Sequence, residues 1–246
     1  MTGMESKDAI RRRVWADMQS RGAARFPGAQ GRIPNFVGAE AAARRLAELP
    51  EWKRAGTLKC NPDFPQLPVR TLALQEGKRI YMAVPRLRDE RPFLLLDPQD
   101  LSLPPRRAAS IKGAGFAGRP VRIDDMPHID LIVCGTVAVN RDGVRIGKGG
   151  GYSDLEFALT LQMGVVDGDT LIATTVHPLQ VLDEELPETA SDFRVDLVVT
   201  PEEVIHCPRS PRPKGIVWED LDDSRIDGIP VLKALARETR RGRVGP

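Results

Sequence analysis

The 246-residue sequence has few cysteines and few aromatic residues, and it lacks a long apolar run. Its three cysteines, Cys60, Cys134 and Cys207, lie far apart without a CxxC pair, so we expect reduced thiols rather than disulfides or a zinc site. No apolar stretch is long enough to cross a bilayer, and none follows the charged N-terminus as in a secretion signal. These absences predict a cytoplasmic protein without a membrane partner.

An excess of charge of either sign is also missing. The 36 Lys and Arg residues nearly balance the 34 Asp and Glu residues, which gives a net charge of +2. That balance argues against a broad nucleic-acid-binding surface and against an acidic disordered tail, and no aromatic-rich RNA-binding pattern is present. The sequence therefore favours a small-molecule ligand over nucleic acid, and it specifies no oligomeric state.

Apolar runs alternate with helical patterns through the middle of the chain. Strands are expected at 57–60, 79–84, 93–96, 129–139, 171–176 and 195–200, and helices at 6–18, 37–49, 69–75 and 155–163. The run 129–139 is almost continuously apolar, which is typical of a strand covered on both faces of a parallel sheet. The pattern predicts an α/β fold with a doubly wound, mostly parallel sheet and helices on both faces. Ligands of such sheets bind beyond the carboxyl ends of the strands.

The chain is predicted to divide near residue 207. Residues 1–207 contain the alternating pattern, whereas 208–246 begin with a linker rich in proline and arginine, 208–214. We expect an edge strand at 215–221, a closing helix at 229–239 and a frayed basic tail, packed on the same domain. The segment 103–122 mixes proline, glycine and basic residues and is expected to be irregular.

The most informative segment is Arg145-Ile146-Gly147-Lys148-Gly149-Gly150-Gly151-Tyr152-Ser153-Asp154. Its order, between an apolar run and an amphipathic one, predicts strand, glycine-rich loop and helix. Glycines let the backbone approach an anion closely, and the N–H groups of the loop and of the following helix can donate to phosphate oxygens. We expect a nucleotide-phosphate site here. The alternative from the residues alone is a glycine-rich hairpin with surface charges.

Together with its flanks, this segment resembles the signature of the 5-formyltetrahydrofolate cyclo-ligases. The same family pattern is matched by Lys7 and Arg11, by Gly77-Lys78 through Pro85-Arg86, by Asp130-Leu131-Ile132-Val133 with Asn140-Arg141-Asp142-Gly143, and by Val195-Asp196-Leu197 to Glu202. The resemblance covers about residues 5 to 206. It implies a doubly wound α/β fold and an enzyme that uses ATP and Mg²⁺ to phosphorylate the formyl oxygen of 5-formyltetrahydrofolate, after which the ring closes and phosphate leaves.

The resemblance also implies roles for individual residues. Lys7 and Arg11 would contact ATP phosphates. The remaining cofactor contacts would come from Gly147, Lys148, Gly149, Gly150, Gly151 and Tyr152, the catalytic groups would be Arg145, Lys148 and Tyr152, and the Mg²⁺ ligands would be Asp154 and Asp196. From the residues alone, Asp154 could equally be an acid that suits the first turn of a helix.

Three departures from the family pattern leave the substrate open. Gly150 stands where the family has a loop lysine, and Ser153 replaces its second tyrosine. The acidic segment that recognises the folate pterin is replaced by the proline-rich residues 61–68. Asn61, Arg70 and Tyr152 are the candidate substrate contacts. The proline-rich segment resembles a cyclo-ligase-like subgroup, which implies, as alternatives, another substrate such as a thiamin-related one, or a non-catalytic nucleotide- or RNA-binding module.

Overall fold

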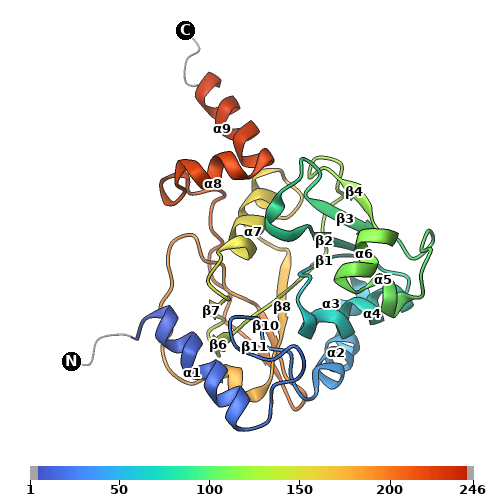
Figure 1. Cartoon of the computed structure of the whole chain (residues 1–246), viewed down its shortest axis with the longest axis vertical. Coiled ribbons are helices and arrows are strands. Elements are labelled where there is room, and N and C mark those ends of the chain that lie inside the picture. The colour runs from blue at the N-terminus through green and yellow to red at the C-terminus, as the bar shows by residue number, and fades with distance from the viewer. Residues whose placement is uncertain (1–4, 243–246) are drawn as a thin grey trace.

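The computed structural model describes residues 5–242, and the side chains of 5–238 (Figure 1). Its helices are α1 (Lys7–Ser20), α2 (Ala39–Glu48), α3 (Pro50–Arg54), α4 (Leu67–Gln75), α5 (Pro105–Ala108), α6 (Ile111–Ala117), α7 (Tyr152–Gln162), α8 (Asp223–Gly228) and α9 (Pro230–Gly242). Its strands are β1 (Thr57–Cys60), β2 (Arg79–Ala83), β3 (Phe93–Leu96), β4 (Arg119–Val121), β5 (Leu131–Cys134), β6 (Ala138–Asn140), β7 (Arg145–Ile146), β8 (Leu171–Thr175), β9 (Val181–Leu182), β10 (Leu197–Val199) and β11 (Val204–His206).

The described residues form one eight-stranded sheet in the order β11-β10-β8-β5-β1-β2-β3-β4. Strands β2, β1, β5, β8 and β10 run parallel, and antiparallel strands close both edges. From β1 the chain builds outward through β2, β3 and β4, and then returns to place β5 on the other side of β1. The strand order therefore reverses between β1 and β5, and a crevice opens beyond the carboxyl ends of these two strands.

Alternate side chains of the central strands enter two separate apolar cores. Tyr81 and Ile132 pack with α7 in one core, whereas Ile80, Leu131 and Val133 pack with α2 to α6 in the other. Figure 1 shows α2 to α6 gathered on one side of the sheet and α7 on the other. Burial of both faces explains the near-continuous apolar runs of the sequence. The predicted doubly wound, mostly parallel α/β sheet is confirmed.

The predicted strand 129–139 is wrong as a single element. The structure divides it into β5, in the main sheet, and β6, in a small sheet of order β7-β6-β9. The division occurs at Gly135, where an added Cβ would lie 3.0 Å from both Asp63 and Ile33. After it, Thr136 accepts a hydrogen bond of 2.8 Å from the Thr174 hydroxyl. Strand β5 therefore ends before Gly135, which lies beside the loop that follows β1, and an apolar run alone cannot reveal where one strand ends and the next begins.

Two other local predictions need correction, and one short helix, α3, was not predicted. The segment 103–122, expected to be irregular, contains α5, α6 and β4. Pro50 begins the short helix α3 besides ending α2, because proline is well suited to the first helical position. Residues 215–221 form a 3₁₀ turn at Trp218–Asp220 rather than an edge strand, and they pack against the core that contains α7, where the N–H of Ile216 donates to the Gln162 side chain.

The C-terminal segment 212–235 packs against α7. Ile229 and Leu232 are buried in the same core as Leu155 and Phe157 of α7. Figure 1 shows α8 and α9 beside the start of α7. None of the helices in the described residues is both long and apolar enough to cross a membrane.

Candidate active site

A cavity of about 440 Å³ lies at the reversal point of the sheet. Its walls are the loop after β1 (Asn61 to Asp63), Gly135 after β5, the residues after β2 and the glycine-rich loop that enters α7. The sheet topology and the glycine-rich segment thus lead to the same place.

The glycine-rich loop leads into α7, whose N-terminus has no side-chain cap. Gly151 is the N-cap of α7 at a φ of 62°, and no side chain caps the N–H groups of the first turn. Gly149 has a φ of 104°, a conformation that residues with a Cβ rarely adopt. Free first-turn N–H groups and the positive end of the helix dipole together favour an anion.

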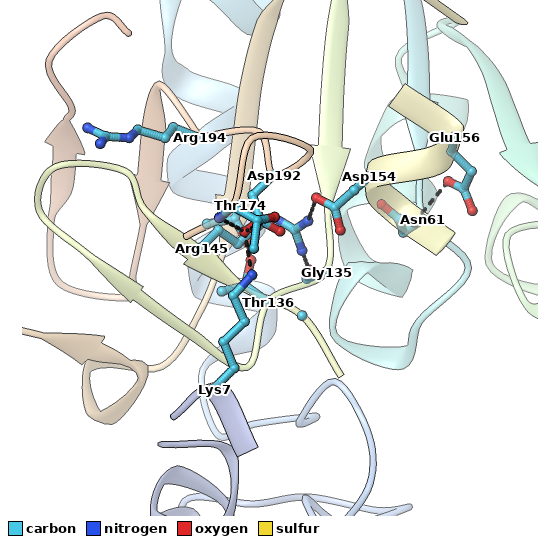
Figure 2. Close-up of polar contacts among 12 residues, drawn as sticks. Lys7, Asn61, Gly135, Thr136, Arg145, Asp154, Glu156, Thr174, Asp192 and Arg194 are labelled. Carbon is cyan, nitrogen blue, oxygen red and sulfur yellow. Dashed lines mark hydrogen bonds and ion pairs between the residues drawn. The ribbon is translucent and has the colours of Figure 1, made fainter. Parts of the chain in front are cut away.

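Arg145 joins β5 to the first turn of α7. Its guanidinium donates to the carbonyl oxygen of Gly135 at 3.1 Å and to Oδ1 of Asp154 at 2.6 Å (Figure 2). It also lies 4.3 Å from the centre of the Phe193 ring, and its side chain is 2% exposed. Burial is the largest single influence and lowers the pKa of Arg145, but the charge and the hydrogen bond of Asp154, together with smaller contributions such as the charge of Asp192, raise the pKa overall. The guanidinium is therefore a fixed positive charge beside the loop.

Two further cations lie at the glycine-rich loop: Lys148 within the loop and Arg11 on α1. Lys148 Nζ donates at 2.9 Å to Oδ1 of Asp63, which lies in the loop after β1, and the Lys148 side chain remains about half exposed. Arg11, on α1, donates through Nε to the carbonyl oxygen of Gly147 at 2.7 Å. With Arg145, they give the loop a positive environment made from two segments, α1 and the loop segment itself.

A buried ion pair forms the inner wall of the cavity. Lys59, on β1, donates to Oε2 of Glu156 at 2.7 Å, and their side chains are only 2% and 7% exposed. The amide nitrogen of Asn61 donates to the same oxygen at 3.3 Å, as Figure 2 shows, while Asn61 Oδ1 is buried without a partner. A buried carboxylate requires such partners because its desolvation is costly. Asn61 and Glu156 both line the cavity.

Arg70 lies behind the cavity wall, 1% exposed. Its guanidinium donates to the carbonyl oxygens of Ala109, Asn61, Pro62 and Asp63. A fork of donors that binds three successive carbonyls fixes the loop after β1. The structure therefore places Asn61 at the cavity, whereas Arg70 lies behind the wall and fixes the backbone of the loop that bears Asn61.

Five predicted site residues do not line the cavity: Lys7, Arg11, Arg70, Gly149 and Asp196. Two of these, Lys7 and Asp196, have ion-pair partners elsewhere. Lys7 forms an ion pair with Asp192, shown in Figure 2, and does not line the cavity. Asp196 precedes β10 and so lies at the amino end of the sheet, opposite Asp154. There Asp196 accepts from the N–H of Ile172 at 2.8 Å and pairs with Arg212. These partners compensate the charge of Asp196, for which the resemblance implied a metal.

Three residues of the site were not among the predicted site residues, although Arg86 belongs to a segment that matches the family pattern. Glu156 follows Asp154 by two residues and reads as a helical surface acid, yet it is buried against Lys59. Asp63 is the ion-pair partner of Lys148. Arg86, after β2, lines the cavity and has a left-handed φ of 61°, a conformation that tends to occur at functional sites.

Tyr152 and Asp154 both line the cavity at the start of α7. Within the described residues, no group of three or more His, Cys, Asp or Glu side chains is arranged to hold a metal. Each cavity carboxylate, Asp63, Asp154 and Glu156, already faces a cation. A divalent cation here would depend mainly on ligands that arrive with a substrate.

His177 has a structural role. Its Nδ1 accepts the N–H of Leu179 at 3.2 Å, and its ring packs edge-on against Phe36. Burial lowers the pKa of His177, so the neutral ring is favoured. It does not line the cavity.

This chain is similar to known proteins over most of its length. The mouse methenyltetrahydrofolate synthase domain-containing protein is 40% identical over 249 residues, covering 97% of this chain and 65% of that protein. Its human counterpart is 38% identical over 248 residues, covering 97% and 63%. The chain thus spans less than two thirds of the length of these relatives.

More distant similarities point the same way. The probable 5-formyltetrahydrofolate cyclo-ligase of Schizosaccharomyces pombe is 23% identical over 181 residues, covering 66% of this chain and 83% of that protein. The solved 5,10-methenyltetrahydrofolate synthetase of Aquifex aeolicus has the same fold, with a TM-score of 0.53, 22% identity, and coverage of 84% and 94%. The model of the 5-formyltetrahydrofolate cyclo-ligase family matches residues 3–201. This chain belongs to the 5-formyltetrahydrofolate cyclo-ligase family.

Proposed function

We propose that this chain is an ATP- and Mg²⁺-dependent cyclo-ligase that acts on 5-formyltetrahydrofolate or a related N-formyl or amide substrate. The terminal phosphoryl group of ATP passes to the formyl oxygen, and ADP leaves. A neighbouring nitrogen of the substrate then attacks the formyl carbon, and the C–O bond breaks to release phosphate. This reaction needs positioning and charge neutralisation more than a nucleophilic side chain.

The observation that carries the proposal is the convergence of Arg11, Arg145 and Lys148 on an uncapped helix N-terminus at the sheet reversal. In the proposed complex, the N–H groups of residues 148 to 152 bind the triphosphate. Lys148 exchanges its exposed partner Asp63 for a phosphate oxygen, whereas Arg145 keeps its buried position and stabilises negative charge from the side.

Mg²⁺ is compatible with this arrangement through Asp154. Magnesium in nucleotide sites keeps several waters and takes one or two carboxylates together with phosphate oxygens, so a dense cluster of acids is unnecessary. When bound, it neutralises charge on the transferring phosphoryl group. Asp196 lies at the other end of the sheet and is not part of the proposed site.

The substrate is proposed to lie between the loop and the inner wall. Asn61 and Tyr152 are the proposed substrate contacts, and Glu156 supplies the acceptor that the missing acidic segment after β1 does not. Lys59 pairs with that carboxylate and does not itself line the cavity.

Formation of a methenyl product tests the proposal. The protein is mixed with MgATP and 5-formyltetrahydrofolate, and near-ultraviolet absorption of the product is followed. Lys148→Ala should reduce the rate by about 100-fold, in the range found when one charge-stabilising donor is removed. Lys53→Ala, an exposed lysine of α3, is the matched control. ATP binding without product would indicate a different substrate, and absence of both would refute the enzymatic assignment.

A further inference from the structure

The segment after β11 lies outside the part of the chain that the family model matches, residues 3–201. It nevertheless returns to the glycine-rich loop. Arg212 anchors its start by pairing with Asp196 and donating to the carbonyl oxygen of Arg194 at 2.8 Å. Ile229 and Leu232 bury its end against α7. The segment is therefore fixed at both ends, and α8 lies between them.

Arg225 of α8 contacts the loop directly. Its guanidinium donates to the carbonyl oxygen of Gly150 at 2.8 Å and lies 5.0 Å from the centre of the Tyr152 ring. A Cβ added to Gly151 would be 3.1 Å from its terminal nitrogen. Asp222 caps α8 by accepting the N–H of Arg225 at 2.7 Å, which fixes the position of the residue.

The contact sets the direction of one peptide group. Because a trans peptide is planar, the N–H of Gly151 must point opposite to the Gly150 carbonyl. Arg225 lines a smaller neighbouring cavity of about 190 Å³ and binds the Gly150 carbonyl from that side. Gly150 and Gly151 line the cavity of the candidate active site. Arg11 acts in the same way on Gly147, whose carbonyl it binds at 2.7 Å.

We infer that Arg225 is a positioning residue of the triphosphate site, supplied by a segment outside the matched family region. By binding the Gly150 carbonyl, Arg225 directs the N–H of Gly151 away from its own guanidinium. It also adds a positive charge behind the loop to those of Arg11, Arg145 and Lys148. This inference rests on the proposed function, because it assigns Arg225 to the same anion site. The phosphates, rather than the base or the sugar, are the part of the nucleotide that depends on it.

The test compares ligands that differ in their number of phosphates. Calorimetric titration measures the affinity of the full chain for MgATP and for AMP. Arg225→Ala should weaken MgATP binding about tenfold or more and leave AMP within about twofold, the loss expected for one hydrogen bond to a charged donor. The affinity of Arg225→Lys for MgATP should lie between those of Arg225→Ala and the unsubstituted protein, because the lysine can still donate to Gly150. Arg209→Ala is the control, since Arg209 belongs to the same segment but pairs with exposed Asp169.

The outcomes separate the two proposals. Equal losses for MgATP and AMP, or a lowered melting temperature with an unchanged ratio of affinities, would overturn the positioning role. Unchanged affinities in Arg225→Ala would overturn it as well. If the unsubstituted protein binds MgATP no more tightly than AMP, the triphosphate site itself is refuted.

Discussion

Lys59 and Glu156 form an ion pair of 2.7 Å that joins β1 to α7 beneath the cavity, almost completely shielded from water. The pair connects the loop that bears Asn61 with the helix whose first turn faces the cavity. Its two charges compensate each other, so the loss of either one leaves the other buried and unpaired.

Glu156→Gln should lower the free energy of unfolding by about 3 to 5 kcal/mol, because the ammonium of Lys59 then lacks a counter-charge. Urea denaturation measures the change. The double variant Lys59→Met, Glu156→Leu should recover most of the stability, since it removes both charges and keeps apolar volume. If Glu156→Gln lowered the free energy of unfolding by less than about 1 kcal/mol, the ion pair would not be shielded from water.

Gly149→Ala should weaken MgATP binding about tenfold or more through backbone strain. The added Cβ would meet Arg11 only at 3.5 Å, which is an ordinary contact, but a φ of 104° is costly for alanine, on the order of 1 to 3 kcal/mol. The loop must then change shape to accept the substitution. Gly168→Ala, where a Cβ meets nothing and φ is not positive, is the matched control. Equal affinities in the two variants, by calorimetric titration, would contradict a requirement for this loop shape.

Cys60 should make stability fall at high pH. Burial raises the pKa of this thiol to about 11, from 9.0 for an unperturbed thiol. Below pH 9 the thiol is neutral in both folded and unfolded chains, and its contribution to stability is fully present. Between about pH 9 and 11 the unfolded thiol ionises first, so stability is lost, by about 3 kcal/mol in total. Urea denaturation from pH 8 to 11 should show a steeper decline in the natural protein than in Cys60→Ala. Parallel curves would contradict the shift.

The fold follows from the sequence because apolar strand runs and the glycine-rich loop are local features. The run 57–60 and the run 171–176 became β1 and β8 because both faces of these strands are buried. The break between β5 and β6 begins at Gly135, which packs closely against Ile33 and Asp63. These two residues are distant in the sequence, so no window around residue 135 contains that information.

The same distinction explains the site. Arg145, Lys148, Gly151 and Asp154 fall within one segment, so the motif brought them to attention together, and all four line the cavity. Arg225 depends on a segment that returns to the loop from 75 residues away in the sequence. The family resemblance implied a metal at Asp196, and only the tertiary structure reveals that Arg212 pairs with this carboxylate instead.

Hydrogen–deuterium exchange of the peptide that spans residues 147–152 tests triphosphate binding at this loop most directly. Exchange is measured with MgATP, with AMP and without ligand. Binding of the triphosphate by these amides predicts that MgATP slows their exchange by about tenfold or more, whereas AMP has little effect. MgATP bound at saturation, with unchanged exchange in residues 147–152 and protection elsewhere, would contradict it.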